Sequence, residues 1–127
     1  MKMKSVAGVI FIVKDLNKSA AFYKTLGFEF KKDIPGVAKT AYLNWFWIEL
    51  LLEDKIVTNE FRHDIKATKK GAGQYIHISV ENVDEYYKEL VKKELKPLSE
   101  PNDYSWGNRE FIIKDPDGYK LVFFKKK

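Results

Sequence analysis

Hydrophobic and polar residues alternate along several short segments of this chain, as in β-strands that bury one face. In residues 74–80 the even positions Ile76, Ile78 and Val80 are apolar, and the odd positions are polar or aromatic. This pattern predicts a strand whose even positions pack under a helix. The opposite face would line a cleft, and it carries Tyr75, His77 and Ser79.

The same alternation assigns faces to two further strands. In residues 46–53 it predicts Ile48, Leu50 and Leu52 under a helix, and in residues 119–124 it predicts Leu121 and Phe123 there. The residues predicted on the cleft side are Trp47, Glu49 and Leu51 from the first segment, and Lys120, Val122 and Phe124 from the second.

Two segments have helical spacing. The first runs from about Asn17 to Leu26, where Gly27 follows as a C-cap, and it should bury Ala20, Tyr23 and Leu26. The second begins with the capping pair Asn82 and Glu85. Its apolar residues recur at i, i+3, i+4, i+7 and i+8, and they are Val83, Tyr86, Tyr87, Leu90 and Val91.

Each helix follows one strand and precedes three, so the chain contains a repeated βαβββ pattern. The first strand spans residues 6–13, and its equivalent, residues 75–80, lies 67 residues further along. We expect one α+β domain over residues 1–127, with a first module at about 1–53, a polar linker at about 54–73 and a second module at about 74–127. The other predicted strands are 28–34, 37–43 and 46–52 in the first module, and 96–98, 109–114 and 119–124 in the second.

The segment from Trp106 to Phe124, WGNREFIIKDPDGYKLVFF, predicts two strands joined by a tight turn. Asp115-Pro116-Asp117-Gly118 provides the turn, because proline fixes φ, aspartate bonds to its own backbone and glycine accepts a positive φ. Together with the upstream FYKTLGF, this segment resembles the vicinal-oxygen-chelate superfamily. That superfamily includes glyoxalase I, extradiol dioxygenases, fosfomycin-resistance enzymes and bleomycin-binding resistance proteins.

The resemblance implies two tandem modules whose sheets form one curved mixed sheet around a cleft, with the helices outside. Metal-dependent members hold a divalent ion with His, Glu or Gln side chains from the first and last strands of each module. Their positions correspond here to Gly8, Glu49, Tyr75 and Val122. Glycine and valine offer no donor and tyrosine is a poor ligand, so we expect neither a metal nor another cofactor.

The amino-acid composition limits the kinds of partner and location that we expect for this protein. The net charge of +5 comes from 23 basic and 18 acidic residues, and only Arg62 and Arg109 provide the guanidinium groups favoured in nucleic-acid recognition. We therefore expect no nucleic-acid partner. No apolar run approaches the roughly 20 residues of a membrane span, and the chain contains no cysteine for thiol chemistry. We expect a cytoplasmic protein with no membrane partner.

Aromatic residues are the main candidates for ligand contact, since they offer flat surfaces at low entropic cost. The predicted ligand-binding set is Trp47, Glu49, Tyr75, His77, Trp106, Val122 and Phe124. His77 and Glu49 have two interpretations. Either they are ordinary strand residues satisfied by neighbours, or they face each other in a cleft, where His77 exchanges a proton or donates a hydrogen bond. His63 is expected at the surface, and no residue is assigned a catalytic role.

The WGNREF and DPDG motifs are especially similar to the metal-free, bleomycin-resistance-like branch, whose members are homodimers that sequester a drug. The resemblance implies a small-molecule-binding protein of the antibiotic-resistance type, and the positive charge favours a neutral or anionic planar ligand over cationic bleomycin. One alternative is a glyoxalase-like lyase or isomerase acting around Glu49 and His77. Another is a non-catalytic dimeric scaffold or regulatory module.

Overall fold

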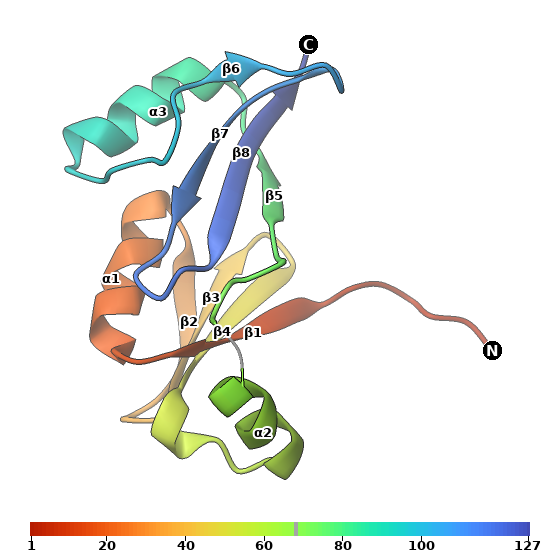
Figure 1. The fold of residues 1–127 in the computed structure, drawn as a ribbon, viewed down its shortest axis with the longest axis vertical. Helices are drawn as coiled ribbons and strands as arrows, with labels where there is room; N and C mark the ends of the chain where they lie inside the picture. The colour runs from red at the N-terminus through yellow and green to blue at the C-terminus, as the bar shows by residue number, and fades with distance from the viewer. Residues whose placement is uncertain (68) are drawn as a thin grey trace. The chain divides into compact units, whose positions relative to one another are not determined.

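The computed structural model describes residues 1–67 and 69–127, and within the helix at 59–67 it leaves the side chains at 61, 64, 66 and 67 undescribed. The chain forms two compact units, Met1–Lys69 and Lys70–Lys127. Each contains a four-stranded mixed sheet with a helix on one face (Figure 1). The α+β class and the two tandem modules agree with the sequence prediction. A single domain spanning residues 1–127 stays a prediction.

The first unit has a sheet in the order β1-β4-β3-β2, with β1 and β4 parallel and the other pairs antiparallel. Helix α1 packs against β3 and β4. The Asp15 side chain caps α1 by accepting a hydrogen bond from the Lys18 N–H at 3.0 Å, and Gly27 ends the helix with a φ of 112°. The elements are β1 (Gly8–Val13), α1 (Leu16–Leu26), β2 (Glu29–Ile34), β3 (Ala38–Leu43) and β4 (Phe46–Leu52).

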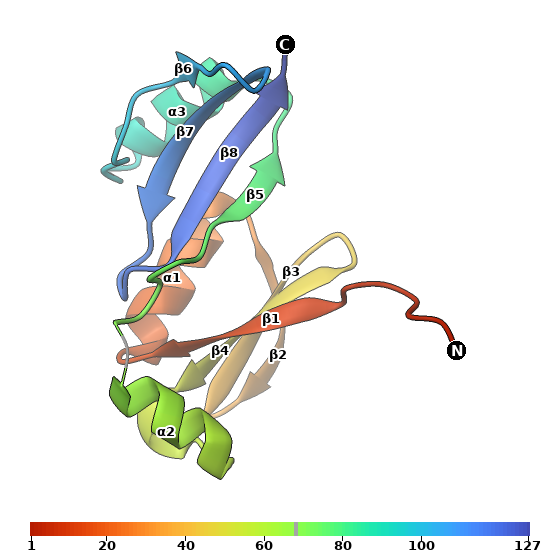
Figure 2. The same cartoon turned by 45° about the vertical axis from the view of Figure 1, so that its right-hand side comes forward.

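The second unit repeats this topology, with strand order β5-β8-β7-β6 and β5 parallel to β8. Helix α3 packs on β7 and β8, and Figure 2 shows the strands of this unit in front of the helix. Asn82 caps α3 as predicted, by accepting a hydrogen bond from the Glu85 N–H at 3.1 Å. The elements are β5 (Ile76–Ser79), α3 (Val83–Lys92), β6 (Asn102–Asp103), β7 (Asn108–Lys114) and β8 (Lys120–Lys126).

The core of each unit lies between helix and sheet. Tyr23 of α1 is fully buried, with Phe28 packed edge-on against its ring at a centroid distance of 5.6 Å. In the second unit Phe111 and Phe123 stack at 5.4 Å beneath α3. Most core positions assigned from the sequence are confirmed, since the side chains of Ile48, Leu50, Ile78, Leu121 and Phe123 are buried. The other three, Leu52, Ile76 and Val80, are only half-buried.

Three expectations about individual elements were wrong. The strand predicted at residues 96–98 is absent, and β6 forms instead at Asn102–Asp103. Prolines 97 and 101 lack an N–H, so this stretch forms isolated hydrogen bonds to β7 in place of a strand ladder, such as that from the Leu98 N–H to the Ile112 carbonyl at 2.8 Å. Val91 is exposed rather than core, and in α1 the buried small residue is Ser19 rather than Ala20.

The predicted linker contains regular structure. A 3₁₀ turn, Glu53–Lys55, precedes helix α2 at Asn59–Ala67, and the Arg62 side chain donates from Nε to the Ile56 carbonyl at 2.7 Å. His63 is exposed on this helix, as expected. Among the described residues, no helix has both the length and the apolar character needed to cross a membrane.

Candidate functional site

Each sheet has a distal face, defined here as the face turned away from the helix of its own unit. In the first unit, Ile48 and Leu50 lie under α1, so the intervening residues of β4 belong to the distal face. Trp47 lies between Gly8 of β1 and Tyr42 of β3 in the strand register. The next row along the strands consists of Ile10, Glu49 and Thr40.

The Trp47 indole occupies the space above Gly8. A Cβ added at Gly8 would lie 2.5 Å from Trp47 Cε2, and it would also collide with Trp47 Cδ2 and with the Trp47 carbonyl oxygen. Gly8 does not have a positive φ. Glycine is therefore needed here for close approach of the tryptophan and not for an unusual backbone conformation.

The distal face of the second unit carries the residues that alternation assigned to it. Tyr75 precedes β5, His77 lies within it, and both are exposed, with Tyr75 at 58%. The His77 ring meets the Phe124 ring of β8 at a centroid distance of 5.7 Å. The structure therefore brings together three of the predicted ligand residues, since Tyr75 and His77 share one strand face and Phe124 lies beside His77.

Lys120 adds a cation to this face. Its ammonium lies 5.7 Å from the centroid of the Tyr75 ring and donates to the Gly71 carbonyl at 2.9 Å. The Gln74 side chain holds the adjacent backbone, accepting from the Lys120 N–H and donating to its carbonyl, both at 3.3 Å. Tyr75 is thus fixed next to a positive charge, an arrangement suited to an anionic group on an aromatic ligand.

Two of the predicted ligand residues differ from expectation in their surroundings. Val122 pairs with His77 in the register, but only 2% of its surface is exposed, so a ligand has little access to it. Trp106 belongs to the turn between β6 and β7, is 62% exposed, and stacks on Tyr104 at 4.6 Å. Its only ring contact in the described part of the chain is thus with Tyr104.

Glu110 is a distal-face residue that the sequence reasoning missed. It lies opposite Phe124 in the register and is 5% exposed, and its Oε2 accepts a long hydrogen bond of 3.4 Å from the Asn108 side chain. Alternation in β7 could have identified it, because Phe111 and Ile113 belong to the core face. Glu110 and Ile112 therefore belong to the opposite face. It places a carboxylate beside the aromatic surface formed with His77.

Proton transfer by Glu49 and His77 stays a prediction. Glu49 is on β4 of the first unit and His77 is on β5 of the second. In the parts of the chain that the structure describes, neither side chain has a hydrogen bond or ion pair that would orient it. A general base is held in place by such a bond, and Ser79 forms none with His77.

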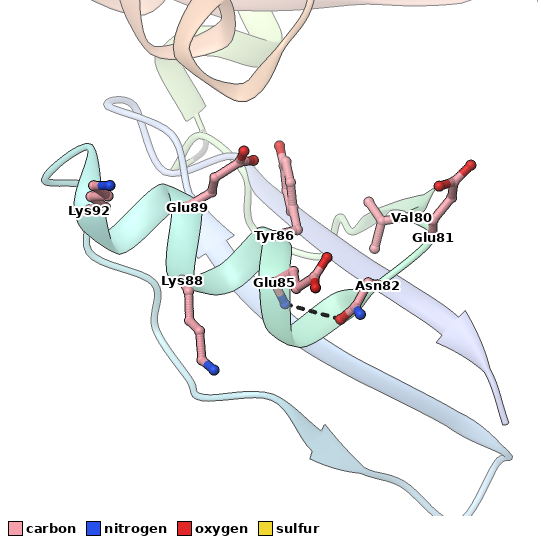
Figure 3. Close-up of a pocket in the computed structure, with 8 residues that line it drawn as sticks. All are labelled: Val80, Glu81, Asn82, Glu85, Tyr86, Lys88, Glu89 and Lys92. Carbon is pink, nitrogen blue, oxygen red and sulfur yellow. Dashed lines mark hydrogen bonds between the residues drawn. The ribbon is translucent and has the colours of Figure 1, made fainter.

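A cavity of about 630 Å³ lies along α3 of the second unit (Figure 3). Its charged lining is of mixed sign, with three glutamates and two lysines, and Asn82 is engaged in capping the helix. Burial, together with the charge of Glu89, raises the pKa of the Tyr86 phenol on its wall, which therefore stays protonated at neutral pH. The mixed charge favours no particular ligand.

Comparison with known proteins identifies the family. The model of the Glyoxalase/Bleomycin resistance protein/Dioxygenase superfamily matches residues 5–123. The chain belongs to this superfamily. It is 30% identical to the metallothiol transferase FosB of Lysinibacillus sphaericus over 97% of this chain and 83% of that protein.

Solved structures of the superfamily share the fold. A member from Sphaerobacter thermophilus is similar with a TM-score of 0.74 at 25% identity, over 98% of each chain. A lactoylglutathione lyase from Agrobacterium tumefaciens also gives a TM-score of 0.74, at 16% identity, over 97% of this chain and 94% of that one. These similarities establish the vicinal-oxygen-chelate fold predicted from the sequence.

The residues at the superfamily's metal-binding positions do not fit a divalent ion. The Trp47 ring fills the space that a side chain at position 8 would need, and Val122 is buried and apolar. Tyr75 lies beside the Lys120 ammonium, whose positive charge would repel a bound cation. Glu49 is the one ordinary donor of the four, and the described residues contain no group of three His, Cys, Asp or Glu placed to hold a metal.

Proposed function

We propose that this protein is a metal-independent small-molecule-binding member of the superfamily, acting by sequestration as its bleomycin-resistance-like branch does. The distal face of each sheet offers aromatic side chains for ligand contact, Trp47 in the first unit and Tyr75, His77 and Phe124 in the second. The expectations of a cytoplasmic homodimer and of a role in antibiotic resistance belong to this proposal.

The observation that carries the proposal is the packing of Trp47 over Gly8. The same contact removes a metal-ligand position and supplies a large aromatic surface in its place. An indole held against a strand keeps few alternative conformations, so stacking of a flat ligand on it loses little entropy. Aromatic contact, and not metal coordination, is the chemistry that this position supports.

The charge distribution supports a neutral or anionic ligand. Residues 1–69 contain 12 basic and eight acidic side chains, whereas residues 70–127 contain 11 and ten. Most of the net charge of +5 therefore belongs to the unit with Trp47, and in the second unit Lys120 adjoins Tyr75. Positive potential raises the local concentration of anions and lowers that of cations.

The test combines metal analysis with a ligand screen. Elemental analysis of the purified protein should find no stoichiometric zinc, nickel, iron or manganese, and EDTA should leave the melting temperature unchanged. A thermal-shift screen of planar neutral and anionic compounds should find ligands that raise it. A hit should quench or shift tryptophan emission, and Trp47→Ala should abolish most of that effect, whereas the control Trp45→Ala, at an exposed position between β3 and β4, should keep it.

A metal-dependent enzyme is the second candidate, favoured by the 30% identity to a metallothiol transferase. Lyase or isomerase chemistry around Glu49 and His77 belongs to the same alternative. About one metal ion per chain, together with loss of thermal stability in EDTA, would overturn the sequestration proposal and favour this one.

A further inference from the structure

The distal face of the second sheet changes in charge along its strands. The register of β5, β8 and β7 arranges the side chains of this face in three rows. Successive rows lie two residues apart on each strand, so the three rows span about 13 Å. The rows are Lys120 with Lys114, then His77 with Val122 and Ile112, then Ser79 with Phe124 and Glu110.

The first row is cationic and the middle row is largely apolar. Lys120 and Lys114 are partners in the register, and the Lys120 ammonium lies 5.7 Å from the centroid of the Tyr75 ring. In the part of the chain that the structure describes, neither lysine forms an ion pair. The middle row consists of the exposed His77, the half-buried Ile112 and the buried Val122. A ring system over the middle row would thus have positive charge at one end.

Glu110, in the third row, has a side chain that the fold leaves poorly satisfied. It is only 5% exposed, and the one hydrogen bond that it accepts is long, 3.4 Å from Asn108 Nδ2 to Glu110 Oε2. It forms no other hydrogen bond or ion pair with the described residues. No fully buried side-chain oxygen or nitrogen among those residues lacks a partner, so the second oxygen, Oε1, keeps access to the surface. This oxygen is available to a donor from outside.

The neighbours of Glu110 do not provide that donor. Phe124 lies opposite on β8 and is apolar, and Asn102 lies opposite on β6, where its Oδ1 accepts from the Asp103 N–H at 3.0 Å. Lys126, one row further along β8, forms no ion pair with Glu110. A buried carboxylate with a single long hydrogen bond is unfavourable, and a ligand that donates a hydrogen bond to it would offset much of that cost.

We infer that Glu110 selects ligands with a hydrogen-bond donor at one end of a flat ring system and an anionic group at the other. The donor bonds to Glu110 Oε1, the rings lie over the middle row beside His77 and Phe124, and the anionic group lies near Lys120. This selection rests on the proposed function and names its ligand class, an elongated aromatic anion with an N–H or O–H group at the far end.

The test uses 4′-aminobiphenyl-4-carboxylate, whose two linked rings match the span of the rows. Its 4′-dimethylamino analogue keeps the rings and the carboxylate but has no N–H donor. Titrated into the whole chain labelled with ¹⁵N, the amine should bind at least tenfold more tightly than the analogue, the gain of one hydrogen bond to a charged acceptor. The largest amide shifts should lie in β5, β7 and β8.

Variants locate the source of this preference. Glu110→Met removes the acceptor at similar length, so the two probes should then bind within twofold of each other. The matched control Glu85→Met removes an exposed carboxylate from α3 and should keep the tenfold preference. Lys120→Met should weaken both probes equally and also keep the preference. In the absence of ligand, Glu110→Met should not lower the melting temperature, because it removes a poorly paired buried carboxylate.

The outcomes separate this selection from the proposed function. Equal affinity of the two probes for the parent protein, or an unchanged preference in Glu110→Met, would overturn the role of Glu110 and leave sequestration of flat ligands standing. If Glu110→Met does not fold, Glu110→Gln replaces it and should reduce the preference at least threefold, and an unchanged preference there would also overturn the inference. Failure of both probes to bind the parent protein would do the same, whereas the metal analysis and the wider screen test the proposed function by themselves.

Discussion

The contact between Gly8 and Trp47 makes a quantitative prediction about stability. Gly8→Ala adds one methyl group where it would meet the Trp47 ring and the Trp47 carbonyl oxygen, with Cε2 at 2.5 Å. Because Gly8 has no positive φ, the substitution introduces no backbone strain of its own. At an unobstructed site it would stabilise the protein by about 0.4–1 kcal/mol through the unfolded state.

The close contact with Trp47 makes Gly8→Ala destabilising instead of stabilising. A methyl group forced into a packed site costs about 1–3 kcal/mol. A side-chain rotation of Trp47 relieves only part of this, because the backbone oxygen is fixed by the strand pairing. Moving β1 away would also weaken the bond from the Trp47 N–H to the Ala7 carbonyl at 3.2 Å, which contributes about 0.5–1.5 kcal/mol. We expect a net loss of about 2–3 kcal/mol in the free energy of unfolding.

The assay is urea denaturation followed by far-ultraviolet circular dichroism, which does not depend on tryptophan emission, with unchanged m as the check on two-state behaviour. The matched control is the double-mutant cycle with Trp47→Ala. Removing the ring should make Gly8→Ala less destabilising by at least about 1 kcal/mol, leaving the part due to the backbone oxygen. A neutral or stabilising Gly8→Ala would refute the close contact between Gly8 and the Trp47 ring.

Three further predictions concern the core, acid stability and association. Ile78→Ala should lower the free energy of unfolding by about 2–4 kcal/mol by opening a cavity under α3, and Trp47→Ala should lower it by less. The reverse order in urea denaturation would mean that the core and distal faces of these strands are misassigned. The Arg109 hydrogen bonds to Asp84 at 2.8 and 2.9 Å lower the pKa of that carboxyl, and the bonds from Lys127 and Arg109 lower that of Asp103. The two ionised carboxylates therefore contribute their full stabilisation above about pH 4, and this stabilisation is lost as the pH falls through their lowered pKa values. Arg109→Gln should flatten the pH dependence of the melting temperature below about pH 4. The control Lys125→Gln should leave that pH dependence unchanged. Each sheet has two edge strands whose backbone groups can pair with another chain, so light scattering should give twice the 14.9 kDa of one chain, and a monomer at high concentration would contradict the homodimer.

The sequence by itself determined the features that depend on near neighbours in the chain. The period-two pattern fixed which residues of β4, β5 and β8 lie under a helix, because successive side chains of any strand point to opposite sides. The Asn82 cap predicted from the sequence fixes where α3 begins, since its side chain satisfies the N–H three residues ahead. The Asp15 cap starts α1 at Leu16, one residue before the predicted beginning. The Asp115 turn was also local, with its carboxylate accepting from the N–H groups of the next turn residues at 2.9–3.0 Å.

The tertiary structure decided which distant segments meet, and alternation carries no information about that. The strand beside β7 is Asn102–Asp103 and not residues 96–98, because pairing needs backbone N–H groups that Pro97 and Pro101 lack. Val122 has the same alternation phase as Phe124 but is buried, and Glu110 is buried although its residue type favours the surface.

The candidate sites depend on register between strands. Trp47 lies over Gly8 because β1 and β4 pair in parallel with these two residues as partners, 39 positions apart in the chain. The local pattern predicted the faces and turns, whereas long-range strand pairing placed the Trp47 ring against Gly8.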